Sequence, residues 1–238
     1  MLCLKSSGRF EWFHSSNVMQ SASTFSDEAL HPAVRGFLHS PEKPNGEALI
    51  LTHSAGSDCN FPLLVSLAET FAGQGYLVLR CDLPFRQERR TGPPFPGNAE
   101  RDRAGLHNAV TALHKIVTGR VFLGGHSYGG RQATMLCSTE HNLVSGLVLL
   151  SYPLHPPRKP EQLRVQHFPN LHTPSLFVHG TRDPFGSVEE MTEALRVISA
   201  KTDLIAVEGA GHDLGFKGKA QAEELPTRLV AKFKAMFG

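Results

Sequence analysis

Short apolar runs alternate with helix-length segments along most of the chain, and this alternation is the feature that most limits the fold. Each run has four or five residues without polar alternation, which is typical of strands buried on both faces of a sheet. Segments with helical spacing lie between the runs and can serve as the crossovers that parallel strands need. The pattern predicts an α/β fold class with a mostly parallel central sheet flanked by helices. The predicted strands are residues 48–52, 76–80, 121–124, 147–151, 175–179 and 203–207, and the predicted helices are residues 62–74, 98–117, 130–138, 188–199 and 222–237.

The length of the chain and the spacing of its prolines favour one domain without a large cap. A chain of 238 residues can bury one sizeable core, and single α/β domains of this size are common. Residues 34–238 hold the whole alternation and are predicted to form that domain, whereas residues 1–33 lack periodicity and are treated as an N-terminal extension. Residues 152–174, between two predicted strands, contain six prolines, which leaves no room for a cap of several helices.

Composition and short motifs exclude several classes of function. With 24 Lys and Arg against 22 Asp and Glu, the formal net charge of +2 produces no strong field for a nucleic acid or an anionic membrane. The four cysteines show no CxxC spacing and no HExxH motif occurs, so we expect free thiols, no metal site and no cofactor. No secretory signal and no apolar run of membrane-spanning length is present, which predicts a cytoplasmic protein without a membrane partner. These features do not specify an oligomeric state.

A GxSxG motif places a serine between a predicted strand and a predicted helix. The motif is Gly125-His126-Ser127-Tyr128-Gly129. A serine on so sharp a turn needs small neighbours, because side chains there would collide with the strand and the helix, and its hydroxyl is held above the sheet. The amino terminus of the helix also favours negative charge at this point. Ser127 is therefore the predicted nucleophile, the alternative being a chance GxSxG in a chain rich in glycine.

A serine nucleophile needs a base and a third group that orients the base, and both are found after later strands. Asp183 follows the strand that ends at residue 179, and His212 lies in a loop with several glycines after the last strand, in the order serine, acid, histidine. Asp183 is the predicted acid, unless it only begins an Asp-Pro turn. His212 is the predicted base. Its rivals His126 and His179 are expected to be packed or hydrogen-bonded instead.

These motifs, in this order, resemble the α/β-hydrolase superfamily over about residues 35–238. Within it, the chain is similar to a branch of small predicted hydrolases related to testis-expressed and histone-acetyltransferase-complex regulatory proteins, with dienelactone hydrolases and small esterases nearby. The resemblance implies an acyl hydrolase in which Ser127 is the nucleophile, Asp183 the acid and His212 the base. The segments that carry the resemblance are residues 51–58, 125–132 and 179–186.

The resemblance also implies an oxyanion hole formed by two backbone N–H groups. One belongs to Tyr128, the residue after the nucleophile, and the other to the loop that follows the strand 48–52. We choose Ala55 for the second donor. Relatives usually have His-Gly where this chain has His53-Ser54, so the N–H of Ser54 is the alternative donor.

An open or loop-covered site favours small soluble substrates over long-chain lipids. We therefore expect a serine hydrolase whose partner is a small-molecule acyl substrate, an ester, thioester, lactone or related acyl compound. Two alternatives are a hydrolase-fold interaction protein with little turnover, and an acyltransferase or perhydrolase that uses the same triad. The candidate substrate contacts are His53, Ser54, Phe85, Arg131, Tyr152 and Phe185.

Three arginines lie on the proline-rich segment that follows the strand 76–80. Arg86, Arg89 and Arg90 could bind a carboxylate or phosphate of the substrate. They are interspersed with Glu88 and prolines, so we expect exposed, solvated side chains rather than ligand contacts.

Overall fold

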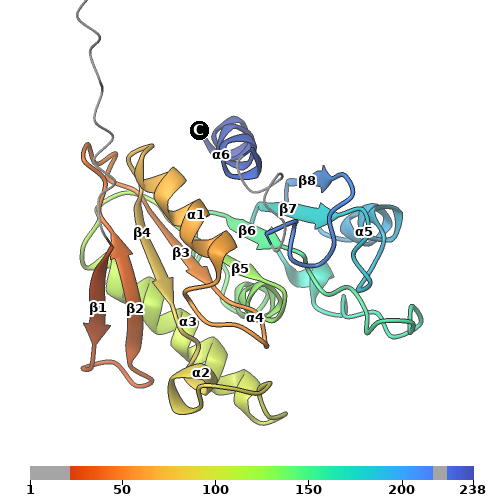
Figure 1. Ribbon diagram of the computed structural model, residues 1–238, viewed down its shortest axis with the longest axis horizontal. Coiled ribbons are helices and arrows are strands. Elements are labelled where there is room, and N and C mark those ends of the chain that lie inside the picture. Colours follow the sequence, from red (N-terminus) through yellow and green to blue (C-terminus); the bar gives the residue numbers. More distant parts are fainter. Residues whose placement is uncertain (1–21, 217–223) are drawn as a thin grey trace, which may run out of the picture.

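The computed structural model describes residues 22–216 and 224–238 of the protein. The strands are β1 (Ser23–Asp27), β2 (Val34–His39), β3 (Ala48–Thr52), β4 (Leu77–Cys81), β5 (Val121–His126), β6 (Leu147–Leu150), β7 (Ser175–Gly180) and β8 (Thr202–Val207). The helices are α1 (Pro62–Ala72), α2 (Pro84–Glu88), α3 (Asn98–His114), α4 (Tyr128–Cys137), the 3-10 helix η1 (Phe168–Asn170), α5 (Val188–Leu195) and α6 (Leu225–Phe237). The strands form one sheet in the order β1-β2-β4-β3-β5-β6-β7-β8 (Figure 1).

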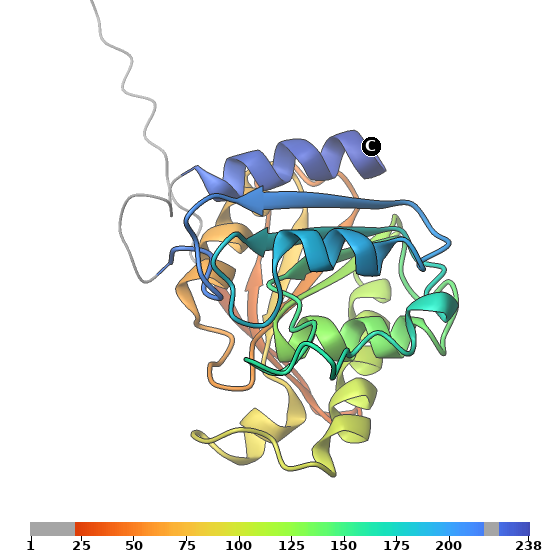
Figure 2. The same ribbon diagram turned by 90° about the vertical axis from the view of Figure 1, so that its right-hand side faces the viewer.

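Helices cover both faces of this sheet, which gives the domain two cores. From β4 to β8 all neighbouring strands are parallel, whereas β2 pairs antiparallel with both β1 and β4. α1 and α6 pack on one face, and α3, α4 and α5 on the other (Figures 1 and 2). Successive side chains of a strand therefore enter different cores: Leu49 and Leu51 lie on the α1 side and Ile50 on the α3 side.

The fold class is confirmed as α/β with a mostly parallel sheet. All six predicted strands and all five predicted helices have a counterpart, with ends shifted by a few residues. The helix after the nucleophile begins at Tyr128 instead of residue 130, and α3 and α5 are shorter than predicted. Residues 222 and 223 of the last predicted helix lie outside the described residues.

The N-terminal region differs from the prediction. Residues 23–27 form β1, which pairs with β2 at the edge of the sheet, so the predicted extension 1–33 contains a strand of the domain. Residues 1–21 lie outside the described part. β1 is short, polar and largely exposed, and such an edge strand leaves little apolar periodicity in a sequence.

The region between β6 and β7 confirms that the domain has no large cap. Within residues 151–174 the only helical element is the single turn η1. This segment therefore places no helical cap over the carboxyl ends of the parallel strands, the edge at which α/β sheets bind ligands. No helix in residues 22–216 or 224–238 has the length and apolarity needed to cross a membrane.

Candidate active site

A continuous chain of hydrogen bonds joins the three residues predicted to form the triad. The Ser127 hydroxyl lies 2.8 Å from Nε2 of His212, and Nδ1 of His212 lies 2.8 Å from Oδ2 of Asp183. Because a carboxylate can only accept, Nδ1 carries the proton and Nε2 is free to accept the proton of the serine. The structure thus brings together side chains from the ends of β5, β7 and β8.

Ser127 sits in a backbone conformation that few non-glycine residues adopt. Its φ is 52° and its ψ is −113° between the last residue of β5 and the first of α4. The turn is tight: a Cβ on Gly125 would lie 2.5 Å from the amide nitrogen of Gly130, and one on Gly129 would lie 2.6 Å from the carbonyl oxygen of His53. Only glycine fits at these two positions, which is the steric reason for the motif.

Asp183 is buried and held as an anion. Its Oδ1 accepts the Phe185 amide at 2.9 Å, while Oδ2 accepts from His212. Burial alone would raise the pKa of this carboxyl, but the hydrogen bond and charge of His212 and the Phe185 amide outweigh it, so the pKa is lowered. A carboxylate fixed in this way can orient an imidazole and stabilise the positive charge that forms on it.

His126, the rival histidine inside the motif, supports the loop of His212. Its Nε2–H donates to the His212 carbonyl at 2.7 Å, and its ring stacks on Phe61 with centroids 5.2 Å apart. Burial, and then the charge of His212, lower the pKa of His126 to about 4, which keeps the ring neutral. The prediction that His126 is hydrogen-bonded rather than the base agrees with this geometry. His179 is likewise buried, with Nε2 2.7 Å from the Gly186 carbonyl.

The loop after β3 is joined directly to the nucleophile turn. The His53 carbonyl accepts the Gly129 amide at 3.2 Å. The His53 side chain is fully buried: Nδ1–H donates to the Ser54 carbonyl at 2.8 Å, and Nε2 accepts the Leu83 amide at 3.0 Å. Burial lowers the pKa of His53, in keeping with a neutral ring that donates on one side and accepts on the other. His53 thus ties the loop to the start of α2 and to α4.

Of the two candidate donors in this loop, Ser54 is engaged and Ala55 is free. The Ser54 amide donates to the Ser57 hydroxyl at 3.3 Å, and the two hydroxyl oxygens lie 2.9 Å apart. The Ala55 amide makes no hydrogen bond within the described part of the chain. Tyr128 opens α4, so its amide is one of the donors that a helix leaves without an intrahelical partner. The oxyanion hole stays a prediction, with the amides of Tyr128 and Ala55 as its candidate donors.

Comparison with known proteins agrees with this architecture. Residues 45–235 match the sequence model of a family described as alpha/beta hydrolase domain. The chain belongs to this alpha/beta hydrolase family. A dienelactone hydrolase from Anabaena variabilis has a TM-score of 0.73 and 18% identity, over 92% of this chain and 100% of that chain. An esterase from Pyrococcus furiosus has a TM-score of 0.71 and 17% identity, over 92% of each chain. A serine hydrolase without a lid from Xanthomonas campestris has a TM-score of 0.70 and 13% identity, over 91% of this chain and 95% of that chain.

Arg86 of this hydrolase domain does not face solvent, which corrects the expectation for the proline-rich segment. The side chain is buried and donates only to backbone carbonyls, those of Ser57 (2.9 Å), Ala55 (3.0 Å), Arg89 (3.1 Å) and Gly92 (3.1 Å). It therefore fastens the loop between β3 and α1 (residues 53–61), named the oxyanion loop after its predicted role, to the start of the proline-rich segment. The segment itself begins with α2, a helix that the prediction missed.

The other two arginines of that segment are closer to the expectation. Arg90 is exposed, and Arg89 is half-buried with its guanidinium 4.2 Å from the centre of the Phe95 ring. Phe95 is itself 63% exposed, so the contact between Arg89 and Phe95 lies at the surface.

Three of the candidate substrate contacts in this hydrolase domain are buried, which corrects their predicted role. His53, Phe85 and Tyr152 are at most 3% exposed, so a bound substrate could not touch them without rearrangement. Phe85 packs against His53 and Tyr128, with ring centroids 5.5 and 5.7 Å apart. Phe85 thus packs between the loop after β3 and the start of α4.

The remaining candidate contacts stay predictions. The Phe185 ring lies 4.3 Å from the ring of His212, centre to centre, and is partly exposed. Ser54 and Arg131 are also partly exposed, one in the oxyanion loop and the other in the first turn of α4.

Asp102 supports the site and was not singled out from the sequence. It lies fully buried on α3, accepts the Tyr128 hydroxyl at 2.7 Å and accepts the Phe85 amide at 3.0 Å. Burial raises its pKa, although both hydrogen bonds oppose the shift. The available signal was an acid four residues before Leu106 on the apolar face of the predicted helix.

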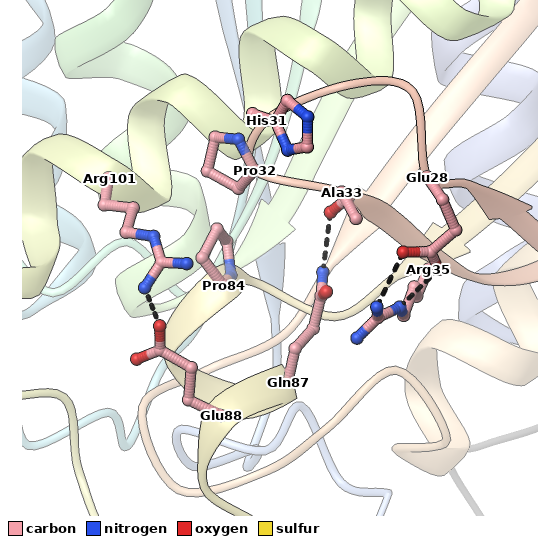
Figure 3. A pocket seen from close by; sticks show the side chains of 9 residues that line it. All are labelled: Glu28, His31, Pro32, Ala33, Arg35, Pro84, Gln87, Glu88 and Arg101. Carbon is pink, nitrogen blue, oxygen red and sulfur yellow. Dashed lines mark hydrogen bonds and ion pairs between the residues drawn. The ribbon is translucent and has the colours of Figure 1, made fainter.

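A hollow of about 470 Å³ lies away from the triad, between the β1–β2 turn, α2 and the start of α3 (Figure 3). Its charged groups are already paired: Arg35 bonds Glu28 through two nitrogens at 2.7 Å, and Arg101 bonds Glu88. Gln87 closes one side by donating to the Ala33 carbonyl at 3.0 Å. Within the described residues, no cluster of His, Cys, Asp and Glu has a metal-binding arrangement, here or at the triad.

Proposed function

We propose that the protein is a serine hydrolase that cleaves a small carboxylic ester, thioester, lactone or related acyl bond. The observation that carries this proposal is the pair of 2.8 Å hydrogen bonds that link Ser127 to His212 and His212 to Asp183. Fold and family support the general class, because α/β-hydrolase domains often carry such a triad at this edge of the sheet.

The proposed reaction follows from the placement of donors and acceptors. Ser127 attacks the acyl carbon while Nε2 of His212 takes its proton, and Asp183 stabilises the imidazolium that forms. The oxyanion of the tetrahedral intermediate accepts hydrogen bonds from the amides of Tyr128 and Ala55. His212 then passes the proton to the leaving group, and water releases the acyl group from Ser127 by the same steps in reverse.

Small substrates are favoured because the segment between β6 and β7 adds no helical cap over the strand ends.

We also infer a cytoplasmic location. Free cysteines support it: Cys59, Cys81 and Cys137 are buried thiols, and burial raises the pKa of Cys81 to about 12.

A fluorophosphonate probe tests the proposal directly. We expect it to label wild-type protein at Ser127, identified by peptide mass spectrometry, and to leave Ser127→Ala unlabelled. A series of p-nitrophenyl esters of increasing acyl length should then show turnover of short chains that is absent in Ser127→Ala. If folded wild-type protein stays unlabelled and inactive, the proposal is wrong and an interaction role of the same fold is favoured. Product analysis with an added alcohol separates hydrolysis from acyl transfer.

A further inference from the structure

Phe185 contacts two members of the triad at once. Its backbone amide donates to Oδ1 of Asp183 at 2.9 Å. Its ring lies 4.3 Å from the ring of His212, centre to centre, with an angle of 35° between the two planes. The short separation and the small angle make this contact closer to a stack of two ring faces than to an edge-on contact. One residue thus touches both partners of the hydrogen bond that orients the imidazole.

The backbone around Phe185 is held from other parts of the domain. The Phe185 carbonyl accepts the His155 amide at 3.0 Å, and the next carbonyl, that of Gly186, accepts from Nε2 of the fully buried His179 at 2.7 Å. Gly186 has a φ of 150°, and a Cβ there would lie 3.0 Å from Cβ of Leu154. The amide of Phe185 and the two carbonyls that follow it are therefore all bonded, which fixes the backbone that carries the ring.

The loop that carries His212 is bonded to the same segment. The Arg182 amide donates to the Ala210 carbonyl at 2.9 Å, which joins the loop after β7 to the loop after β8. A Cβ on Gly180 would lie 2.3 Å from that carbonyl oxygen, so the two loops approach as closely as their backbones allow. The approach of the Phe185 ring to the imidazole is thus supported by direct bonds between the two loops.

His212 is the least enclosed residue of the triad. Its side chain is 23% exposed, whereas the side chain of Asp183 is fully buried and Ser127 is buried as well. Two hydrogen bonds hold the imidazole, and the one to the serine hydroxyl is given up when the serine attacks an acyl group. A flat apolar ring against one face of the imidazole opposes its rotation throughout the reaction, because rotation would drive the imidazole into that ring.

The Phe185 ring also suits the charge that the proposed reaction creates. The imidazole of His212 becomes an imidazolium when it takes the serine proton. The face of an aromatic ring attracts a cation that lies within about 6 Å of the ring centre, and it attracts a neutral group less. This attraction is gained mainly as the transition state forms, so it raises kcat and leaves the binding of substrate nearly unchanged.

We propose that Phe185 is a positioning residue that keeps the His212 imidazole in the orientation for proton transfer and stabilises the imidazolium. This role rests on the proposed function, because Phe185 acts through the base of the proposed reaction. It differs from the role of a substrate contact, in which the ring would line the acyl pocket and change KM.

Steady-state kinetics with p-nitrophenyl esters separate these two roles. Phe185→Leu keeps an apolar side chain but removes the flat ring. We expect kcat to fall by roughly 3- to 30-fold, by the same factor for acetate and butyrate esters, with little change in KM. Phe185→Tyr keeps the ring and should retain a kcat close to that of wild type. Phe95→Leu, which removes an exposed ring of the same size from the proline-rich segment, is the matched control and should keep the wild-type kcat.

The tautomer of His212 provides a measurement that does not depend on turnover. Long-range proton–nitrogen NMR distinguishes a proton on Nδ1 from one on Nε2, and the His212→Gln variant identifies the signal. At about pH 8.5, where an ordinary histidine is neutral, we expect wild type and Phe185→Tyr to show only the Nδ1–H form. Phe185→Leu should show a mixture with the Nε2–H form, because its imidazole turns away from Asp183 more often. Phe185→Met replaces the leucine variant if the latter does not fold.

The positioning role is overturned if folded Phe185→Leu keeps both the wild-type kcat and the single tautomer. It is also overturned if the variant changes only KM, to an extent that depends on acyl length, since Phe185 would then be a substrate contact. If wild type turns over no ester and takes up no fluorophosphonate, but the tautomer depends on Phe185, the positioning role stands and the hydrolase proposal fails. If wild type hydrolyses esters and neither kcat nor the tautomer depends on Phe185, the hydrolase proposal stands and the positioning role fails.

Discussion

At the carboxyl ends of β5, β7 and β8, side chains face the reacting point and the backbone holds them. His212, for example, is oriented by Asp183 and fixed from behind through its own carbonyl, which accepts from His126. At the ends of β3 and β4 the division is reversed. There the Ala55 amide, which makes no hydrogen bond within the described residues, is the proposed oxyanion donor, and the buried side chains of His53 and Arg86 hold the loop. The proposed site therefore has two parts. In the side-chain half, at the ends of β5, β7 and β8, side chains carry out the proposed reaction. In the backbone half, at the ends of β3 and β4, side chains only hold a loop whose amide is the proposed oxyanion donor.

The largest effect should come from the side-chain half. Asp183→Asn removes the acceptor that keeps the proton on Nδ1 of His212, so Nε2 no longer accepts from Ser127. We expect kcat for the best ester to fall by about 10⁴-fold with the fold intact. Asp203→Asn is the control: Asp203 lies on β8 and pairs with Lys232 of α6, and this variant should keep full activity. An Asp183→Asn rate within tenfold of wild type would contradict the assigned role of the acid.

The next largest loss of activity is expected in the backbone half, from a change at Arg86, a buried residue that holds the loop. Arg86→Met leaves four carbonyls without their donor and frees the oxyanion loop. A misplaced oxyanion donor predicts a fall in kcat of about 10²-fold with little change in KM. Arg86→Lys should not restore the rate, because one ammonium group cannot reach all four carbonyls. Arg90→Met, on the exposed neighbour, serves as the control, and equal effects of both methionine variants would refute the positioning role.

Lower pH should reduce the stability of the fold by protonating His126, which donates to the His212 carbonyl. The folded-state pKa of His126 is about 4, below the ordinary value of 6.5, so the unfolded state binds more protons between these values. Stability is therefore lost as the pH falls from about 6.5 toward 4, with a slope of up to about 1.4 kcal/mol per pH unit for this group. In urea unfolding measured between pH 6.5 and 4.5, the free energy of unfolding should change less steeply with pH in His126→Asn than in wild type. His114→Asn, at an exposed position, should keep the wild-type slope, and an unchanged slope in His126→Asn would contradict the assignment.

The smallest effect is expected inside the oxyanion loop. Ser57→Ala removes the hydroxyl that accepts the Ser54 amide, a hydrogen bond of ordinary strength. We expect kcat to fall severalfold, up to about tenfold, because the loop stays fastened by Arg86 and His53. Ser66→Ala on α1 is the control. A gain in kcat would point instead to the Ser54 amide as the better oxyanion donor.

Sequence patterns predicted the side-chain half of the site and most of the parallel sheet, for physical reasons that the backbone half does not share. Ser127, Asp183 and His212 are reactive residue types at strand ends, and their order along the chain is readable. An oxyanion donor is any amide, so the residue type of Ala55 carries no signal of its own. The burial of Arg86 was missed because its partners are carbonyls, which every residue has.

The edge strand shows the same limit in the fold. β1 has one apolar residue, Phe25, among polar ones. It is held by pairing with β2, a contact between backbone groups that no local sequence pattern reveals. Predicted strands were correct where burial on both faces forced a run of apolar residues.

The short segment between β6 and β7 has a consequence for the lifetime of an acyl group on Ser127. If Ser127 carries an acyl group as proposed, the lack of a helical cap in residues 151–174 leaves the ester carbonyl open to solvent on that side once the leaving group departs. Water would then compete with every other acceptor without waiting for a helical cap to open. In the proposed reaction, such an edge favours release of a free acid over transfer of the acyl group to a second molecule.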